Sequence, residues 1–359
     1  MTDISDKISE MQKFVQSVDH VHPRGGGSKP TLSMPADGFE SLEMKPITGV
    51  VEYEPEEFTI TALAGTPIAA INSILAENKQ YLPFDPPLVE GGATLGGTVA
   101  SGVSGPGRYR YGGLRDFLLG VKYIDYSGVV QRGGGKVVKN AAGFDLAKVM
   151  IGSLGSFGVI VESTLKVFPV PETYTTLNLS FENLDEALDI LQKASVSHLD
   201  FESIDLMSEN GRWTVWFRVG SLIETLEARV SRVLEFLGNG EALQRVEEES
   251  VWDNFREFSW VPDGWTLIKI PFVPGNITNF ESKFIGIESL RQYSCAGQVL
   301  WIAVKNAVEE VDKILIDMDL SGLILFGSSE RKLIGANVSA SFYRRVKSAL
   351  DPVNRFVEV

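Results

Sequence analysis

The glycine residues are concentrated in one part of this sequence, and that concentration limits what the part can fold into. Of the 35 glycines in the 359-residue chain, 18 lie between Gly91 and Gly158. They follow no repeat period and are interspersed with branched and aromatic residues, so the segment is neither collagen-like nor a flexible linker. A folded, glycine-dense segment has backbone at positive φ or in very close contact with something else. We therefore expect the ligand site of this chain to lie there.

Composition and charge exclude several classes of protein. Hydrophobic residues make up 44% of the chain and charged residues 22%, which is typical of globular domains, and the length favours two of them. The net charge of −14 argues against sequence-independent binding to nucleic acid. No apolar run approaches the roughly 20 residues of a transmembrane helix, and the polar start of the chain is unlike a secretory signal. We expect a cytoplasmic protein.

Cysteine and histidine are scarce. The single cysteine, Cys295, excludes an internal disulfide, and the histidines are His20, His22 and His198. We therefore expect no metal site. Cys295 is interpreted as a small buried residue, and the aromatic group from Trp252 to Trp265 as core or interface.

Hydrophobic periodicity predicts an α+β chain with no internal repeat. The spacing predicts helices over 4–18 and 144–151, and another that begins after Thr66, which is expected to cap it. A hairpin is predicted to turn at Ser127-Gly128, between strands 116–126 and 129–132. Further strands are expected over 50–53, 58–64 and 159–170. The second half shows strand, helix, strand, strand, helix over 175–181, 184–194, 201–207, 212–219 and 223–237, which favours an antiparallel sheet. A last helix is predicted over 342–350.

Three glycine segments suggest phosphate binding. The first is Arg24-Gly25-Gly26-Gly27-Ser28-Lys29, where successive N–H groups can form an anion nest beside two cations; a plain surface loop is the alternative. The second runs from residue 90 to 107 and precedes a group of basic and tyrosine residues, and the third runs from 152 to 160. Neither the G-x-G-x-x-G fingerprint nor the P-loop is matched by these segments.

Taken together, the motifs resemble a known family. Arg24 to Ser28, Phe84-Asp85-Pro86-Pro87, Thr94-Leu95-Gly96-Gly97, Tyr111-Gly112-Gly113-Leu114-Arg115-Asp116 and Leu154 to Ile160 occur in the order of the FAD-binding domain of the vanillyl-alcohol-oxidase (PCMH-type) superfamily. Lys139-Asn140-Ala141-Ala142-Gly143-Phe144 resembles the branch of bacterial glycolate oxidase E subunits. The resemblance is close over residues 45–172 and weak in the second half.

The resemblance implies a fold and a cofactor. The fold would be a two-subdomain PCMH-type FAD-binding domain over 1–172, with a smaller α+β cap on an antiparallel sheet over 173–335. Residues 336–359 would be a helix and tail that return to the FAD domain. FAD would be bound without a covalent link, because the glycine loop contains no histidine; attachment through His20 or His22 is the alternative. The residues implied to bind FAD are Arg24, Gly25, Gly26, Gly27, Ser28, Lys29, Asp85, Pro86, Thr94, Leu95, Gly96, Gly97, Ser101, Gly102, Gly105, Tyr111, Arg115, Gly158, Val159 and Ile160.

The resemblance also implies a function in a complex. The chain would be the FAD-binding subunit of a glycolate oxidase, with a catalytic flavoprotein subunit and an iron–sulfur subunit as partners. Through them it would reach the inner membrane. One alternative is a self-sufficient 2-hydroxy acid dehydrogenase that uses Tyr174 or Tyr293 and a carboxylate-binding arginine such as Arg212, Arg218 or Arg331. Another is a flavin-free structural subunit. The tail from Leu350 to Phe356 lacks the family's final Asn-Pro-Gly, which leaves its role at the flavin site open.

Overall fold

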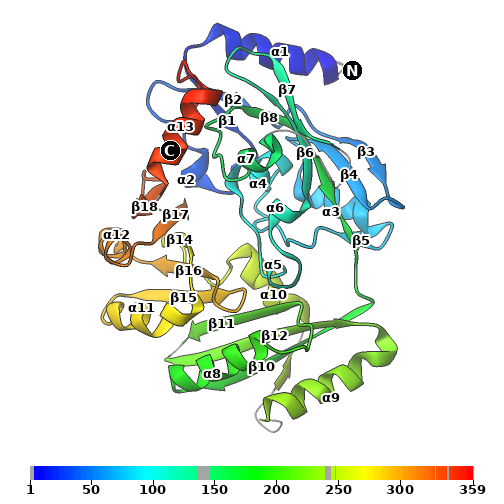
Figure 1. The fold of residues 1–359 in the computed structure, drawn as a ribbon, viewed down its shortest axis with the longest axis vertical. Coiled ribbons are helices and arrows are strands. Elements are labelled where there is room, and N and C mark those ends of the chain that lie inside the picture. The colour runs from blue at the N-terminus through cyan, green and yellow to red at the C-terminus, as the bar shows by residue number, and fades with distance from the viewer. Residues whose placement is uncertain are drawn as a thin grey trace. The chain divides into compact units, whose positions relative to one another are not determined.

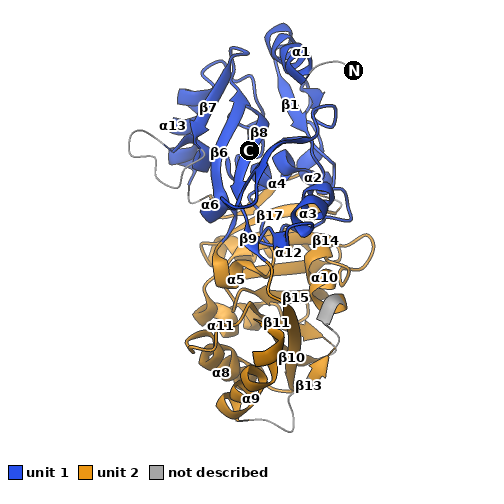
Figure 2. Ribbon diagram, turned by 90° about the vertical axis from the view of Figure 1, so that its right-hand side faces the viewer, with its two compact units in different colours: residues 1–104, 113–169, 339–359 blue, residues 105–112, 170–338 orange. Residues whose placement is uncertain are grey.

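The computed structural model describes residues 4–135, 145–209, 211–238, 244–246, 248–327, 329–337 and 339–358. The chain divides into two compact units (Figure 2). Unit 1 comprises residues 1–104, 113–169 and 339–359, and unit 2 comprises residues 105–112 and 170–338. One division between the units lies at 169/170, and the C-terminal helix and tail belong to unit 1.

Unit 1 is built on an antiparallel sheet whose five described strands follow the order β3 (Val50–Glu54), β4 (Thr59–Leu63), β8 (Val159–Lys166), β6 (Leu118–Ile124) and β7 (Val130–Gly134) (Figure 1). A separate pair of parallel strands is formed by β1 (Val21–Arg24) and β2 (Glu40–Glu43), and a short pair by β5 (Gln80–Tyr81) and β9 (Phe168–Pro169). The helices are α1 (Ile4–Ser17), α2 (Pro30–Ser33), α3 (Ile68–Ala76), α4 (Leu95–Ser101), α6 (Leu114–Phe117), α7 (Leu146–Met150) and α13 (Ala340–Leu350).

Local sequence accounts for most of these elements. Helix α1 buries Met11 and Val15, as its spacing predicts. The β6–β7 hairpin turns at Gly128, whose φ of 81° only glycine adopts without strain. The cap assigned to Thr66 is wrong, because its hydroxyl binds the backbone of Gly49 at 3.0 and 3.2 Å instead of capping α3. The predicted helix over 144–151 is confirmed for Leu146–Met150, whereas Phe144 lies outside the described residues.

Unit 2 contains an antiparallel sheet whose nine described strands follow the order β13-β10-β12-β11-β15-β16-β14-β17-β18. The bounds are β10 (Thr173–Phe181), β11 (Ser203–Glu209), β12 (Arg212–Ser221), β13 (Gln244–Val246), β14 (Thr266–Pro271), β15 (Ser289–Ser294), β16 (Val299–Val304), β17 (Ser321–Phe326) and β18 (Leu333–Gly335). The helices are α5 (Arg108–Tyr111), α8 (Leu184–Ser195), α9 (Leu226–Leu237), α10 (Glu248–Glu257), α11 (Ile277–Lys283) and α12 (Val308–Asp317), with single 3₁₀ turns at Ile223–Thr225 and Pro274–Asn276.

The order of elements repeats in unit 2, so the expectation of no internal repeat is wrong at the level of structure. The elements β10-α8-β11-β12-α9-β13 are followed by β14-α11-β15-β16-α12-β17 in the same order of strands and helices. In the sheet the two sets run in opposite directions from a shared seam, where β11 pairs antiparallel with β15 and Leu206 lies opposite Tyr293. Unit 2 is therefore two βαββαβ halves joined edge to edge.

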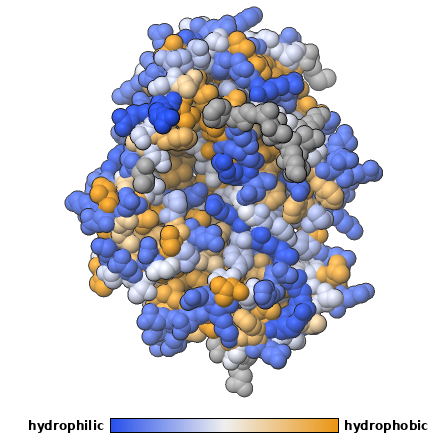
Figure 3. Space-filling view, viewed as in Figure 1, coloured by the Kyte–Doolittle hydropathy of each residue, from blue (hydrophilic) through white to orange (hydrophobic). Residues whose placement is uncertain are grey.

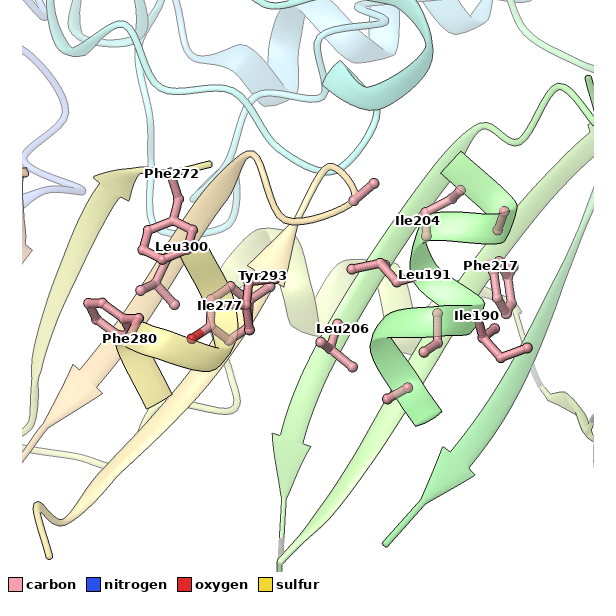
Figure 4. Packing of buried hydrophobic residues seen from close by; sticks show 14 of the residues in the cluster. Ile190, Leu191, Ile204, Leu206, Phe217, Phe272, Ile277, Phe280, Tyr293 and Leu300 are labelled. Atoms are coloured by element: carbon pink, nitrogen blue, oxygen red, sulfur yellow. The ribbon is translucent and has the colours of Figure 1, made fainter. Parts of the chain in front are cut away.

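The helices α8, α9, α11 and α12 bury one face of this sheet. Figure 4 shows Ile190 and Leu191 of α8 beside Ile204, Leu206 and Phe217 in one half; in the other half Phe272, Ile277, Phe280, Tyr293 and Leu300 gather around α11. On the opposite face, α10 places Trp252 and Phe255 against Met207 and Trp216. The indole N–H of Trp252 donates to Thr176 Oγ1 at 2.6 Å. The aromatic group predicted as core or interface thus contributes Trp252 and Phe255 to a buried cluster.

Exposed apolar side chains are scattered. The four most exposed in the described part of the chain come from separate segments and are Ile285, Val196, Ile223 and Phe342. On the face drawn in Figure 3, hydrophobic residues are interspersed with hydrophilic ones. Such single exposed residues are normal on a folded protein.

Candidate cofactor site

The three glycine segments meet in unit 1 around a cavity. Its empty volume, including the open mouth, is about 720 Å³. The loop after β1 supplies one wall, α4 a second and the segment leading into β8 a third. Of the residues implied to bind FAD, the cavity is lined by Gly25, Gly26, Gly27, Ser28, Lys29, Thr94, Gly96, Gly97, Ser101, Gly158 and Ile160.

The other implied residues do not line this cavity, and their roles stay predictions. The guanidinium of Arg24 points to Glu43 at 3.4 Å, and Arg115 is exposed on α6. Leu95 and Val159 are core residues, Gly102 ends α4 in the left-handed conformation, and Asp85 and Pro86 are buried elsewhere in unit 1. Gly105 and Tyr111 belong to unit 2, where the hydroxyl of Tyr111 lies 3.4 Å from Glu202 Oε1.

Several lining residues were not singled out from the sequence. They are Pro23, Leu32, Ser33, Met44, Ala100, Leu154 and Gly155. Leu154 and Gly155 stand inside the third glycine segment, so the motif itself was a signal for them. Leu32 and Ser33 come from α2, which begins at Pro30 directly after the first glycine loop. Proline at the first position of a helix is a usable signal for that turn.

The first glycine loop presents unused backbone donors. Among the described residues, the N–H groups of Gly25, Gly26, Gly27 and Ser28 find no acceptor. Lys29 next to them is only 5% exposed. Across the cavity the buried hydroxyl of Thr94 makes no hydrogen bond in the described structure. Consecutive N–H donors, a buried cation and an orphan hydroxyl are a donor set suited to phosphate oxygens. The residues present therefore fit the diphosphate of FAD.

Close packing explains why two of these positions are glycine. A Cβ atom at Gly25 would lie 2.5 Å from Thr94 Oγ1, and one at Gly26 would overlap the carbonyl oxygen of Gly92. Both glycines let the first loop lie directly on the second segment. A branched residue at position 26 would thus disturb the protein as well as a ligand, and this position cannot test cofactor binding alone.

Gly96 and Gly97 differ in the same respect. A Cβ atom at Gly96 would lie 2.8 Å from the Cβ of Ala64, so this glycine packs α4 against the end of β4. A Cβ atom at Gly97 would meet only Thr94 Oγ1, at 3.2 Å. Gly97 therefore faces space that belongs to the cavity.

The C-terminal tail holds the third wall in place. Lys347 is 6% exposed, and its Nζ donates to the carbonyl of Ser156 at 2.9 Å, to Asp351 Oδ2 at 2.6 Å and to the carbonyl of Phe356 at 2.6 Å. Burial lowers the pKa of Lys347, and Asp351 opposes this shift. The carbonyl of Arg355 accepts a hydrogen bond from the N–H of Val21 at 2.7 Å. The tail that departs from the family pattern thus links β1 to the segment that contains Leu154 and Gly155.

The catalytic candidates in unit 2 are engaged with other groups. Tyr293 donates to Glu281 Oε1 at 2.5 Å on the helix-covered face of the sheet, and burial raises its pKa well above the usual value. The guanidinium of Arg218 stacks on the ring of Tyr174 at 4.0 Å. Arg212 pairs with Glu182, and Arg331 with Glu309 and Asp312.

The remaining candidates are ordinary in their surroundings. His20 lies 3.1 Å from the carbonyl of Asn354, His22 is buried in β1, and His198 is on the surface of unit 2. No group of three or more His, Cys, Asp or Glu residues suited to a metal ion is found in the ranges described above.

None of the described helices is long and apolar enough to span a bilayer. The motif Lys139–Phe144 lies outside the described residues.

Known proteins share this architecture. Residues 2–134 match the family model of the FAD binding domain. Glycolate oxidase subunit GlcE of Escherichia coli is 35% identical over 234 residues, which is 65% of this chain and 63% of that protein. Glycolate oxidase subunit GlcD of Bacillus subtilis is 31% identical over 166 residues, or 46% of this chain and 35% of that protein. A D-lactate dehydrogenase of Anaerostipes hadrus is 28% identical over 173 residues, or 48% of this chain and 36% of that protein.

The fold comparison extends further along the chain. A solved structure of alkyldihydroxyacetonephosphate synthase superposes with a TM-score of 0.72 at 16% identity, and covers 96% of this chain and 73% of that one. The expected PCMH-type fold is confirmed. FAD as the cofactor and the resemblance to PCMH-type flavoproteins are confirmed as well.

Proposed function

We propose, on the premise that residues 2–134 form an FAD binding domain, that this chain is the FAD-binding subunit of a 2-hydroxy acid oxidoreductase. The substrate class is that of small 2-hydroxy acids such as glycolate. Electrons pass through the flavin to an iron–sulfur partner, and a second flavoprotein subunit completes the complex. The protein acts in the cytoplasm or at the inner membrane through these partners.

The observation that carries this proposal is the cavity in unit 1. Its walls come from segments that are far apart in the sequence, and they present unused N–H groups, a buried lysine and an orphan hydroxyl. The names of the relatives, glycolate oxidase subunits and D-lactate dehydrogenase, support the reaction class. This chain spans about two thirds or less of their lengths, so we offer activity and partners as a proposal.

The residues around the cavity have separate tasks toward FAD. Gly25 to Ser28 would bind phosphate oxygens through N–H groups, Lys29 would neutralise their charge and Thr94 would add a hydroxyl. Gly97 would leave room for the cofactor. The buried hydrogen bonds of Lys347 would keep the third wall in position. When bound, FAD supplies the two-electron acceptor for oxidation of an alcohol.

The test is a spectrum followed by a pull-down. Purified full-length protein is expected to show the visible bands of oxidised flavin, and acid should release all of the flavin because no covalent link is expected. A tagged chain recovered from its native cell is expected to bring a second flavoprotein and an iron–sulfur protein with it. A colourless protein that binds no added FAD would refute the cofactor site, and recovery of the chain alone would refute the complex.

A self-sufficient dehydrogenase is the second candidate. It is favoured by the similarity to a D-lactate dehydrogenase, a relative that is named as an enzyme and not as a subunit. Robust turnover of glycolate by the purified chain with an artificial electron acceptor would support it, whereas turnover only after addition of partners supports the complex.

A further inference from the structure

We infer that Glu202 is a positioning residue: it fixes the loop 105–112 in unit 2, and through this loop the binding of FAD in unit 1 is coupled to unit 2. This inference deepens the proposed function and rests on it, because FAD is taken to occupy the cavity in unit 1. It adds a residue of unit 2 to those that determine the affinity for the cofactor.

The loop 105–112 belongs to unit 2, but the chain on both sides of it belongs to unit 1. Helix α4, which lines the cavity, ends at Ser101, and only three residues separate it from the loop. The base of the loop is closed in unit 1, where the N–H of Leu114 donates to Ser104 Oγ at 3.1 Å. Figure 2 shows α5, inside the loop, in the colour of unit 2. A change in the position of the loop therefore acts on the chain directly after α4.

The loop depends on contacts with the rest of unit 2 for its conformation. Its helix α5 has only four residues, and a single helical turn is unstable without tertiary contacts. Glycine stands on both sides of α4's connection to α5 and beyond, with a φ of 62° at Gly102 and of 91° at Gly112. Glycine changes its backbone conformation at low cost, so these two positions can act as hinges.

The carboxylate of Glu202 holds two consecutive residues of α5. Its Oε1 lies 3.4 Å from Arg110 Nη1, and the hydroxyl of Tyr111 donates to the same oxygen at 3.4 Å. The guanidinium of Arg110 also donates to the carbonyl of Asp200, and the ring of Tyr109 packs against the core of unit 2. Glu202 therefore provides the anionic contact at the centre of the docked loop.

The surroundings of Glu202 in unit 2 fit this task. Glu202 is 5% exposed and directly precedes β11, and its N–H donates to the carbonyl of Arg218 at 2.8 Å. A Cβ atom at Gly220 would lie 2.9 Å from Glu202 Oε1, so glycine leaves room for the carboxylate there. Burial raises the pKa of Glu202, and the charges of Arg110, Arg218 and Arg229 oppose this shift. Since a buried carboxylate is costly without its donors, undocking of the loop is unfavourable.

Docking of the loop and binding of FAD affect each other. The docked loop holds the chain after α4 in the conformation in which α4 lines the cavity. Coupling between two equilibria is reciprocal, so FAD should stabilise the docked loop by the same factor by which the docked loop favours FAD. Loss of the Glu202 contacts should therefore weaken FAD binding, although Glu202 does not line the cavity.

The Kd of the full-length protein for FAD tests this coupling by isothermal titration. Glu202→Leu removes the carboxylate and should raise the Kd about tenfold, within the range typical of coupled sites. Glu202→Gln keeps an acceptor oxygen and should restore much of the affinity. Gly220→Ala should also raise the Kd, because it displaces the carboxylate without removing it. Glu182→Leu is the matched control, because Glu182 pairs with Arg212 at 3.3 Å in the same unit, and it should leave the Kd unchanged.

Hydrogen exchange provides a readout that a merely structural role of Glu202 would not move. In the wild type, FAD should slow amide exchange in residues 105–112 as well as in the cavity walls of unit 1. In Glu202→Leu, saturating FAD should still protect the walls, and the protection of residues 105–112 should be lost.

The outcomes separate this inference from the proposed function. An unchanged Kd for FAD in Glu202→Leu, or wild-type exchange in residues 105–112 that does not respond to FAD, would overturn the inference and leave the proposed function standing. An equal rise in Kd in Glu182→Leu would also overturn it, because the effect would then be a general loss of stability. Wild-type protein that binds no FAD would overturn both. If Glu202→Leu does not fold, Gly220→Ala decides by the same criteria.

Discussion

Gly97 offers the sharpest test of where FAD lies, because the space beside it belongs to the cavity. A Cβ atom there meets only Thr94 Oγ1 at 3.2 Å, so Gly97→Leu fits the protein without FAD after a small shift of one hydroxyl. Gly97 is the third residue of α4, and leucine there gains up to about 0.8 kcal/mol of helix propensity over glycine. The variant without FAD is therefore expected to be as stable as the wild type or slightly more stable.

Binding of FAD should respond in the opposite way. The leucine side chain places four carbon atoms between α4 and the glycine loop, where the cofactor phosphates are expected. At a hundredfold excess of FAD over Kd, the wild type gains about 2.7 kcal/mol from binding. For a domain of the size of unit 1 this corresponds to a rise in Tm of about 5–11 °C. In Gly97→Leu that rise should vanish.

The assay is thermal unfolding of both proteins with and without added FAD. Gly275→Leu is the matched control, because a Cβ atom at Gly275 in unit 2 meets nothing within 4 Å and its φ is ordinary. The control should keep the full shift with FAD. An equal rise in Tm for Gly97→Leu would show that FAD does not occupy this cavity. A Tm of the variant without FAD well below that of the wild type would refute the interpretation that the space beside Gly97 is open.

Three further predictions concern other parts of the molecule. Lys347→Met leaves Asp351 buried without its cation, so it should lower the free energy of unfolding in denaturant by about 3–5 kcal/mol and also lower the affinity for FAD. Lys13→Met, at an exposed lysine, is the control and should change neither quantity. Burial and the charge of Asp205 raise the pKa of Cys295 to about 12. A disulfide reagent at pH 8 should therefore leave the native chain unlabelled and label one thiol after unfolding. Rapid labelling of the native protein would contradict the burial of Cys295. Burial opposes ionisation of Asp125, but hydrogen bonds from Ser127, Gln131 and Val129 lower the pKa of its carboxyl group. The ionised carboxylate therefore stabilises the hairpin above about pH 4, and this contribution is lost as the pH falls through the lowered pKa. Asp125→Asn should thus cost about 1 kcal/mol in urea unfolding at pH 7 and much less at pH 3, and an equal cost at both values would contradict the sign.

The fold of unit 1 and of the first half of unit 2 could be predicted because their surface elements alternate. Helix α8 and strand β12 each have one buried and one solvated side, and their patterns are readable. The later strands are different. All six residues of β16 are buried, and β14 is buried along most of its length, so neither shows the alternation that marks a strand. Continuous apolar runs do not distinguish a buried strand from a buried helix.

The residues of the candidate site also differ in how far they could be predicted from the sequence. Glycine segments are visible in a sequence, and their resemblance to a known family brought together residues that do line one cavity, such as Gly25, Gly97 and Gly158. The part played by Lys347 was not visible. A single lysine in α13 has no motif around it, and only the packing of the tail shows that its Nζ reaches the carbonyls of Ser156 and Phe356. The arginines singled out instead, Arg212 and Arg331, have acidic partners that are distant in sequence.

The hydrogen bonds from Lys347 to Ser156 and to the tail also determine when the cofactor cavity can be completed during synthesis of the chain. One wall of the cavity is held by residues 347–357, yet the ribosome must first synthesise residues 170–338. At about 5–20 residues per second, that interval lasts roughly 8–34 seconds. Unit 2 is contiguous apart from one short segment, so it can fold while unit 1 still lacks its last piece. The nascent chain therefore exposes an unfinished cofactor cavity, and tight capture of FAD is expected only late in synthesis, after the tail has docked.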